Sequence, residues 1–474
     1  MRKYLLAAVL AALAAIPCAA GSYSEAELKK MFQQSVDTDD LRLRASLRSK
    51  IAKASPDSAC GLVSQAYLLD QAGAITPKQK MDLYTRAIAL DHGLAVAYYN
   101  RAHIYSQSGQ KEKALEGYKQ AIAAGFRKPD AYVGLADAYM HAGNTGLAVE
   151  NYSKALSMAP GHAFAHNNRG SMYLKLGEYD KAIADFDAAL KTSTFAMAHM
   201  NRGDAYTGKK MYLKALEDYR AAVDLIPDSP DPYLRRGIMY LTAKDYVKAR
   251  NNLDKSLELD PQKASAWLYL GIALYQTEKY DDALAAYTRS LNLNIGNTDP
   301  YLQMADVYVT QGRHQLAADK LSYGLSLAPG RAALRQKRAR VYTALGMDKE
   351  AAADYAELFK SAPSAELHYE RGDFHLCAGR YKSAEADLLR SKKKDPRSAG
   401  VLVDLALVYI RTGRKTEGLK LFSYVTRKSP ATTDSYRKLL ATGLKRSNYY
   451  GENKIKLLRE MLALYDGAMN GGTE

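Results

Sequence analysis

Residues 129–160 read PDAYVGLADAYMHAGNTGLAVENYSKALSMAP, and their pattern is the clearest indication of the fold. It predicts two helices joined at Gly143, where a residue with positive φ suits a tight turn. Pro160 ends the second helix, because proline cannot continue one. Residues 196–227, AMAHMNRGDAYTGKKMYLKALEDYRAAVDLIP, repeat the arrangement of small and aromatic residues, so the stretch is one unit of a repeated structure.

The recurrence has a period of about 34 residues and runs from Ala95 to Pro430. It resembles the tetratricopeptide repeat, whose pattern places aromatic residues, Leu-Gly, Tyr, Ala and Pro at fixed offsets. The resemblance implies an all-α, right-handed superhelical solenoid of helix-turn-helix repeats. Ten repeats are expected to start near Ala95, Pro129, Ala163, Ala196, Pro230, Ala264, Thr298, Ala332, Ala365 and Ala399.

The composition agrees with a packed repeat array. Hydrophobic residues make up 47% and charged residues 25% of the 474 positions, so the chain can bury a core. Tyrosine is in excess, with 36 Tyr against 8 Phe and one Trp. Because most of these tyrosines fall on aromatic positions of the repeat, we expect them in the core and not on a surface that stacks nucleic-acid bases.

The pattern also divides the chain. We expect a signal peptide over 1–20, a helical segment over 21–56, a divergent first repeat that caps the array over 57–94, and ten repeats over 95–430. Terminal capping helices are expected over 431–466 and a disordered tail over 467–474.

The first twenty residues predict export to the periplasm or the extracellular space. Arg2 and Lys3 precede an apolar run that ends at Ile16, and small residues follow. Cleavage after Ala20, acylation at Cys18 and an uncleaved anchor are the three alternatives, of which cleavage fits best. After cleavage Cys60 and Cys377 remain, too far apart along a non-closing solenoid for a disulfide.

No catalytic arrangement stands out from the repeat pattern. The sequence lacks a phosphate-binding glycine loop, a nucleophile elbow and a His-Glu-x-x-His motif. His162 and His166 have a metal-ligand spacing, but no carboxylate or cysteine is placed beside them in the sequence. We therefore predict a protein that is not an enzyme, with no cofactor, no metal and no nucleic-acid partner.

The resemblance assigns a concave groove to first-helix positions 2, 5, 6, 9, 12 and 13. Asn100, Asn168 and Asn201 share position 6, where stacked amides would hydrogen-bond an extended peptide; the alternative is that they only face water. In the next two repeats the groove turns apolar, which a partner or a tighter superhelix would cover. The expected peptide-binding residues are Tyr99, Asn100, His103, Gln107, Asp137, His141, Asn167, Asn168, Lys175, Asn201, Asp204, Leu234, Ile238, Leu268, Ile272 and Tyr275.

Charge gathers toward the C-terminus. Residues 331–474 hold 28 Lys and Arg against 17 Asp and Glu, in a chain of net charge +16. A solvated basic face is one interpretation, and attraction to acidic proteins, anionic lipid or an envelope polymer is the other. The expected basic patch consists of Arg331, Arg335, Lys337, Arg338, Arg340, Lys392, Lys393 and Lys394.

The leading functional hypothesis is a scaffold that binds peptide segments of other proteins in its groove, in bacterial envelope assembly. The second is an envelope factor that grips an anionic polysaccharide or a membrane surface by its basic C-terminal third. Salt would separate them, because polyanion binding weakens steeply with ionic strength. The sequence leaves the oligomeric state open.

Overall fold

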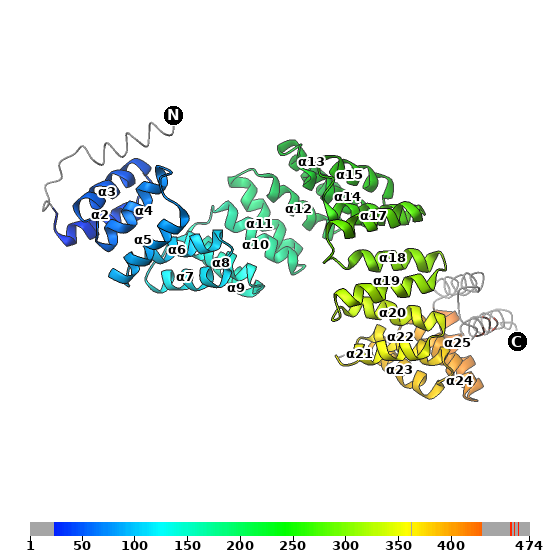
Figure 1. Cartoon of the computed structure of the whole chain (residues 1–474). Helices are drawn as coiled ribbons and strands as arrows, with labels where there is room; N and C mark the ends of the chain where they lie inside the picture. Colours follow the sequence, from blue (N-terminus) through cyan, green and yellow to red (C-terminus); the bar gives the residue numbers. More distant parts are fainter. Residues whose placement is uncertain (1–22, 362, 429–455, 457–458, 460–462, 464–474) are drawn as a thin grey trace. The chain divides into compact units, whose positions relative to one another are not determined.

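The computed structural model describes residues 23–361 and 363–428, together with residues 456, 459 and 463. The expected signal peptide over 1–20 and the tail over 467–474 lie outside the described residues, as do all but three residues of the expected cap over 431–466. The described part forms 24 α-helices and no strand, which confirms the predicted all-α fold class (Figure 1).

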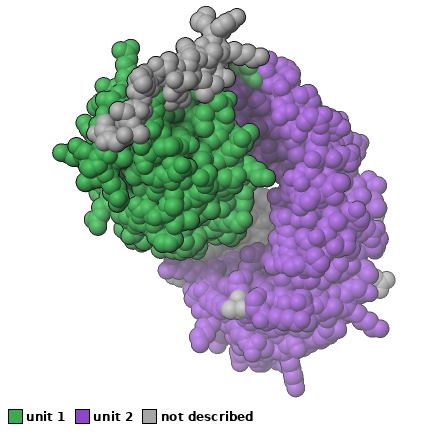
Figure 2. Space-filling view, turned by 60° about the vertical axis from the view of Figure 1, so that its left-hand side comes forward, with its two compact units in different colours: residues 1–228 green, residues 229–474 purple. Residues whose placement is uncertain are grey.

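The chain divides into two compact units, residues 1–228 and 229–474 (Figure 2). Unit 1 contains α2 (Glu25–Asp37), α3 (Leu41–Ala54), α4 (Ala59–Gln71), α5 (Pro77–Leu90), α6 (Ala95–Gln107), α7 (Lys111–Ala123), α8 (Pro129–His141), α9 (Thr145–Met158), α10 (Ala163–Lys175), α11 (Tyr179–Thr192), α12 (Ala196–Gly208) and α13 (Tyr212–Leu225).

Unit 2 continues the same alternation of helices. It contains α14 (Pro230–Thr242), α15 (Tyr246–Leu259), α16 (Ala264–Gln276), α17 (Tyr280–Leu293), α18 (Asp299–Thr310), α19 (His314–Leu327), α20 (Ala332–Leu345), α21 (Asp348–Leu358), α22 (Ala365–Cys377), α23 (Tyr381–Lys394), α24 (Ala399–Arg411) and α25 (Lys415–Lys428). From α6 onward the helices pack as successive pairs, each with a first and a second helix.

Small residues on the first helix let the second helix approach closely. A Cβ atom added at Gly203 of α12 would lie 2.9 Å from Cε1 of Tyr219 on α13, which is closer than side chains pack. Ala215 on α13 is fully buried. One aromatic position of the second helix is buried in seven of the described pairs, with 2% exposure or less: Tyr118, Tyr152, Phe186, Tyr219, Tyr287, Tyr355 and Phe422.

The turn inside each pair uses the left-handed backbone region. Gly143, the predicted turn residue, has a φ of 78°, which confirms that interpretation, and Gly177 holds the equivalent turn of the next pair with a φ of 74°. Three consecutive pairs place a residue with a side chain there instead: Lys210, Lys244 and Glu278, with φ of 60°, 61° and 60°. A side chain in this region strains the backbone by roughly 1–2 kcal/mol.

The four helices before the first full pair share its core. Phe32 of α2, Ile51 of α3 and Leu62 of α4 pack in one cluster with Ala97 and Ile104 of α6. Both cysteines of the described part, Cys60 and Cys377, are free thiols. Within the described ranges, no helix is long and apolar enough to span a bilayer.

Candidate functional site: the first-helix surface

Buried tyrosines fix two carboxylates on the first helices of unit 1. Tyr152 on α9 donates its hydroxyl hydrogen to Asp137 on α8, and Tyr219 on α13 donates to Asp204 on α12 at 2.7 Å. Burial raises the pKa of Asp137, although hydrogen bonds from Tyr152 and Asn168 oppose that change. Each of these two predicted groove carboxylates is therefore held by a tyrosine of the second helix of its own pair.

A chain of side-chain hydrogen bonds links α8, α10 and α12. Asn168 donates its Nδ2 hydrogen to Asp137 at 3.1 Å and accepts one from Asn167 at 3.1 Å. Asn201 donates to Oδ1 of Asn167 at 3.1 Å and to the Ser171 hydroxyl at 3.2 Å. We call the residues Asp137, Asn167, Asn168 and Asn201 the polar line.

The burial of this line corrects the predicted asparagine ladder. Asn167 and Asn201 are only 6% and 8% exposed, so their amides form the floor of the surface and are not presented to a peptide. Asn100 and Asn168 remain partly exposed. The predicted ladder consisted of Asn100, Asn168 and Asn201, and Asn167 was predicted only as a groove residue. Burial therefore removes Asn201 from the ladder and Asn167 from the groove surface, because α10 and α12 bond to each other there.

Around the polar line, several predicted groove residues are accessible. His103, Gln107, His141 and Lys175 are exposed, and Asp204 is partly exposed. The Nε2 atoms of Gln107 and His103 lie 3.0 Å apart. Tyr99, by contrast, stacks on Phe126 with ring centroids 4.6 Å apart, and burial raises its pKa to about 12.

Two apolar residues next to the polar line were missed in the sequence. Phe164 is 64% exposed and Met197 is 45% exposed, and the Phe195 ring lies 5.6 Å from that of Phe164. Each precedes an asparagine of the line by four residues, a spacing that puts both on one helix face. The sequence contains a signal for them, because Phe164 and Met197 both occupy position 2 of their repeats, one of the positions assigned to the groove.

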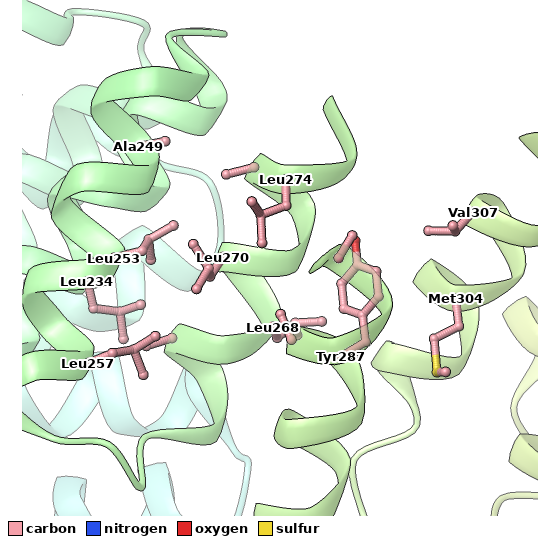
Figure 3. Packing of buried hydrophobic residues seen from close by; sticks show 14 residues of the cluster. Leu234, Ala249, Leu253, Leu257, Leu268, Leu270, Leu274, Tyr287, Met304 and Val307 are labelled. Atoms are coloured by element: carbon pink, nitrogen blue, oxygen red, sulfur yellow. The ribbon is translucent and has the colours of Figure 1, made fainter. Parts of the chain in front are cut away.

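In unit 2, the predicted apolar stretch of the groove is largely core. Leu234 and Leu268 are each 8% exposed and belong to a cluster with Leu253, Tyr287 and Met304 (Figure 3). They are not available as peptide anchors, which corrects that prediction. Ile238, Ile272 and Tyr275 are half-buried against the same cluster, and the Tyr275 hydroxyl lies 2.9 Å from that of Thr310.

The predicted basic patch on α20 is paired with acids of unit 2. Lys337 contacts Asp306 at 2.5 Å and Arg340 contacts Glu366 at 2.8 Å. The remaining pairs are Arg331 with Asp299, Arg338 with Asp354 at 2.7 Å, and Arg335 with Asp354 at 3.8 Å. Lys392, Lys393 and Lys394 form the last turn of α23, where cations are favourable. The α20 charges therefore stabilise neighbouring helices, and the patch expected there is not a free basic surface.

The pair of Arg338 and Asp354 is one example of a contact that recurs between the first and second helices of several repeats. An arginine of the first helix binds, through two hydrogen bonds of 2.7–2.9 Å, an aspartate sixteen residues later on the second helix. In three of the four pairs a histidine also lies 2.9–3.0 Å from that aspartate. The groups are His166/Arg169/Asp185, His199/Arg202/Asp218, Arg338/Asp354 and His368/Arg371/Asp387. The 16-residue spacing of arginine and aspartate is visible in the sequence, but the predictions above did not include it.

The histidines considered for a metal site are occupied by these contacts. His166 lies 2.9 Å from both Asp185 and the Pro160 carbonyl, and His162 caps α10 by accepting from the Ala165 amide. Among the residues that the structure describes, there is no group of three or more His, Cys, Asp or Glu that could hold a metal ion.

Comparisons with known proteins agree with this architecture. The profile of the family described as Tetratricopeptide repeat matches residues 99–163, and that of the Cilia and flagella-associated protein 70 C-terminal domain matches residues 162–373. Human tetratricopeptide repeat protein 13 is 25% identical over 125 residues, 26% of this chain. The match spans only 14% of the length of that protein.

Similar solved structures include YrrB, described as a tetratricopeptide-repeat protein with an unusual peptide-binding site, and yeast Tom70. YrrB is 24% identical, with 42% of this chain and 99% of its own covered at a TM-score of 0.35. Tom70 is 15% identical, with 88% and 97% covered at a TM-score of 0.43. A tetratricopeptide repeat protein from Parabacteroides merdae is 21% identical, with 59% and 98% covered at 0.36.

The tetratricopeptide fold supports a role as a scaffold for protein–protein interaction, and its families are generally non-catalytic. The repeated helix pairs and the two profile matches together show that this chain is a tetratricopeptide-repeat protein.

Proposed function

We propose that unit 1 binds an extended segment of a partner protein along α6, α8, α10 and α12, without catalysing a reaction. The observation that carries this proposal is the exposure of Phe164 and Met197 beside the polar line. A large aromatic side chain that is 64% exposed leaves apolar surface in water, and a bound apolar side chain would cover it.

The polar groups around these two residues suit a peptide backbone. Asn100 and Asn168 are partly exposed amides, and an amide both donates and accepts hydrogen bonds. His103, Gln107 and His141 add further polar groups on α6 and α8. An extended segment would place an apolar side chain on Phe164 and Met197 and its backbone along the amides.

The hydrogen bonds of the polar line preorganise the side chains of this surface in the unbound protein. Asn168 is held by Asp137 on one side and by Asn167 on the other, and Asn201 holds Asn167 in turn. Binding then orders fewer side chains, which reduces its entropic cost.

We further propose that the chain acts in a bacterial envelope after export. The support is the basic and apolar pattern of residues 1–20. Fractionation of cells that express the full chain tests this proposal: a shortened chain in the periplasm or medium supports it, and a full-length chain confined to the cytoplasm contradicts it.

The binding proposal is tested by site-specific crosslinking in the native cell. A photoreactive residue is placed at His141, at Met197, or at Leu213, which is 80% exposed on the second helix α13. We expect His141 and Met197 to crosslink to one continuous segment of a single partner, whereas Leu213 does not. A synthetic peptide of that segment should then bind the purified chain.

Two variants measure the contribution of the surface. Phe164→Ser should weaken binding of the peptide, because it removes the exposed ring, while Leu213→Ser makes a similar exchange outside the surface and should leave binding unchanged. Equal crosslinking from all three sites, or equal affinity of both serine variants, would refute the assignment.

A further inference from the structure

A cavity of about 390 Å³ lies in unit 2, and among its lining residues only Arg340 belongs to the predicted basic patch. Its walls come from α20, α21 and α22. The lining residues are Arg340, Thr343, Tyr355, Glu366, Tyr369, Glu370 and Asp373.

The cavity is acidic although it lies in the most basic part of the sequence. Three carboxyl groups, those of Glu366, Glu370 and Asp373, face one guanidinium, that of Arg340, which gives a formal charge of −2. Arg340 contacts Glu366 at 2.8 Å and also contacts Glu370. The one guanidinium of the lining is therefore shared between two carboxylates.

Glu370 is the unusual member of this group. Its side chain is 7% exposed, and its Oε1 atom accepts hydrogen bonds from Gln336 at 2.8 Å and from Arg340. Its Oε2 atom is buried and receives no hydrogen bond from any described residue. A buried carboxylate oxygen without a donor is costly. Because Oε2 has almost no accessible surface, a donor in the cavity gains this interaction only when the Glu370 carboxylate turns toward the cavity that its residue lines.

We propose that this cavity receives the cationic side chain, arginine or lysine, of a partner protein. The guanidinium or ammonium group would donate to the turned carboxylate of Glu370 and share the negative charge of Glu366 and Glu370 with Arg340. The rings of Tyr355 and Tyr369 line the same space and suit the stem or the face of such a cation. This site lies in unit 2 and does not depend on the peptide surface proposed for unit 1.

The test uses the purified full chain with three small probes: N-acetyl-arginine amide, N-acetyl-lysine amide and N-acetyl-citrulline amide. Citrulline keeps the length and polarity of arginine but carries no charge. Ligand-observed NMR should show millimolar binding of at least one cationic probe and much weaker binding of citrulline. The stronger of the two cationic probes identifies the side chain.

Three variants assign the binding to the cavity. Glu370→Gln should weaken the cationic probe by roughly 10- to 100-fold, the loss expected when a charged hydrogen-bond acceptor is removed. Glu366→Gln tests the same charge at a side chain that is 68% exposed, where the fold is not at risk. Glu385→Gln is the matched control, because it makes the same charge change in the α23 ion pair with Arg414, outside the cavity.

The proposal is overturned if neither cation binds, if citrulline binds equally well, or if Glu370→Gln and Glu366→Gln bind like the unaltered chain. Weakening by Glu385→Gln as large as that by Glu370→Gln would indicate a general charge effect and would also overturn it. The variant Phe164→Ser should retain the probe, so failure of this site and failure of the unit 1 surface are distinguishable.

Discussion

Tyr219 and Tyr287 occupy the same position of their helix pairs but have opposite hydrogen-bonding states. The Tyr219 hydroxyl donates to Asp204 at 2.7 Å. Tyr287 is fully buried, and its hydroxyl has no partner among the described residues. The reason is that Ile272 stands in its pair where Asp204 stands in the other. Replacing each tyrosine by phenylalanine should therefore have opposite effects on stability.

The size of the difference follows from hydrogen-bond energetics. Tyr219→Phe removes a bond to a carboxylate and should lower the free energy of unfolding by about 1.5–3 kcal/mol. Tyr287→Phe removes a buried hydroxyl that bonds to nothing and should raise that free energy by about 1 kcal/mol. The two variants should differ by about 3 kcal/mol, which is roughly a hundredfold change in an opening equilibrium.

Hydrogen exchange of the full chain measures this difference locally, because repeat proteins open in parts. Protection of the α12 and α13 amides should fall in Tyr219→Phe, whereas protection of the α16 and α17 amides should hold or rise in Tyr287→Phe. An equal loss of protection in both variants would refute the reasoning, since it would mean that ring packing, and not the hydroxyl, decides the outcome.

Three further predictions concern the repeat architecture. Gly143→Ala should lower the free energy of unfolding by about 1–2 kcal/mol because its φ is 78°, whereas Gly146→Ala, with nothing near its Cβ position, should raise it by about 0.5–1 kcal/mol in urea unfolding. Ala215→Leu should lower the melting temperature through about 1–3 kcal/mol of overpacking, and Lys214→Leu on the exposed face should not; equal shifts would contradict the helix register. The pKa of Asp218 lies below its ordinary 3.8, because hydrogen bonds from His199 and Arg202 outweigh the effect of burial. Its contribution to stability is therefore present above about pH 4 and lost as the pH falls through the lowered pKa, so urea midpoints measured against pH should fall less steeply in Asp218→Asn.

The fold could be predicted because each repeat carries its own signals for helix, turn and helix end within about 34 residues. A glycine such as Gly143 marks the turn, and Pro160 marks the end of the second helix, so no long-range information is needed. Lys244 shows the limit of this reasoning, because it adopts the left-handed turn with no local signal for it. There the turn follows the packing of the helices on either side.

The candidate surface could be predicted only in part, because its accessibility depends on neighbouring repeats. Asn168 and Asn201 both occupy position 6 of their repeats. Only Asn201 is buried, and its amide donates hydrogen bonds to Asn167 and Ser171 of α10. The accessibility of a charge also depends on a neighbouring repeat. Lys337 contributes to the basic patch predicted from the sequence, but it pairs with Asp306, which lies 31 residues earlier. A pairing between repeats becomes visible only when the helices are placed side by side.

The strained turns at Lys210, Lys244 and Glu278 fall in three successive helix pairs, within residues 196–293. In a linear array each pair is held by its own stability and by its neighbours, and the ends usually fray first because they lack one neighbour. Here the pairs with the weakest turns lie in the interior. Unfolding could then begin in the middle of the chain, with residues on either side still folded, so that a protease would first release two folded fragments and not shorten the protein from its ends.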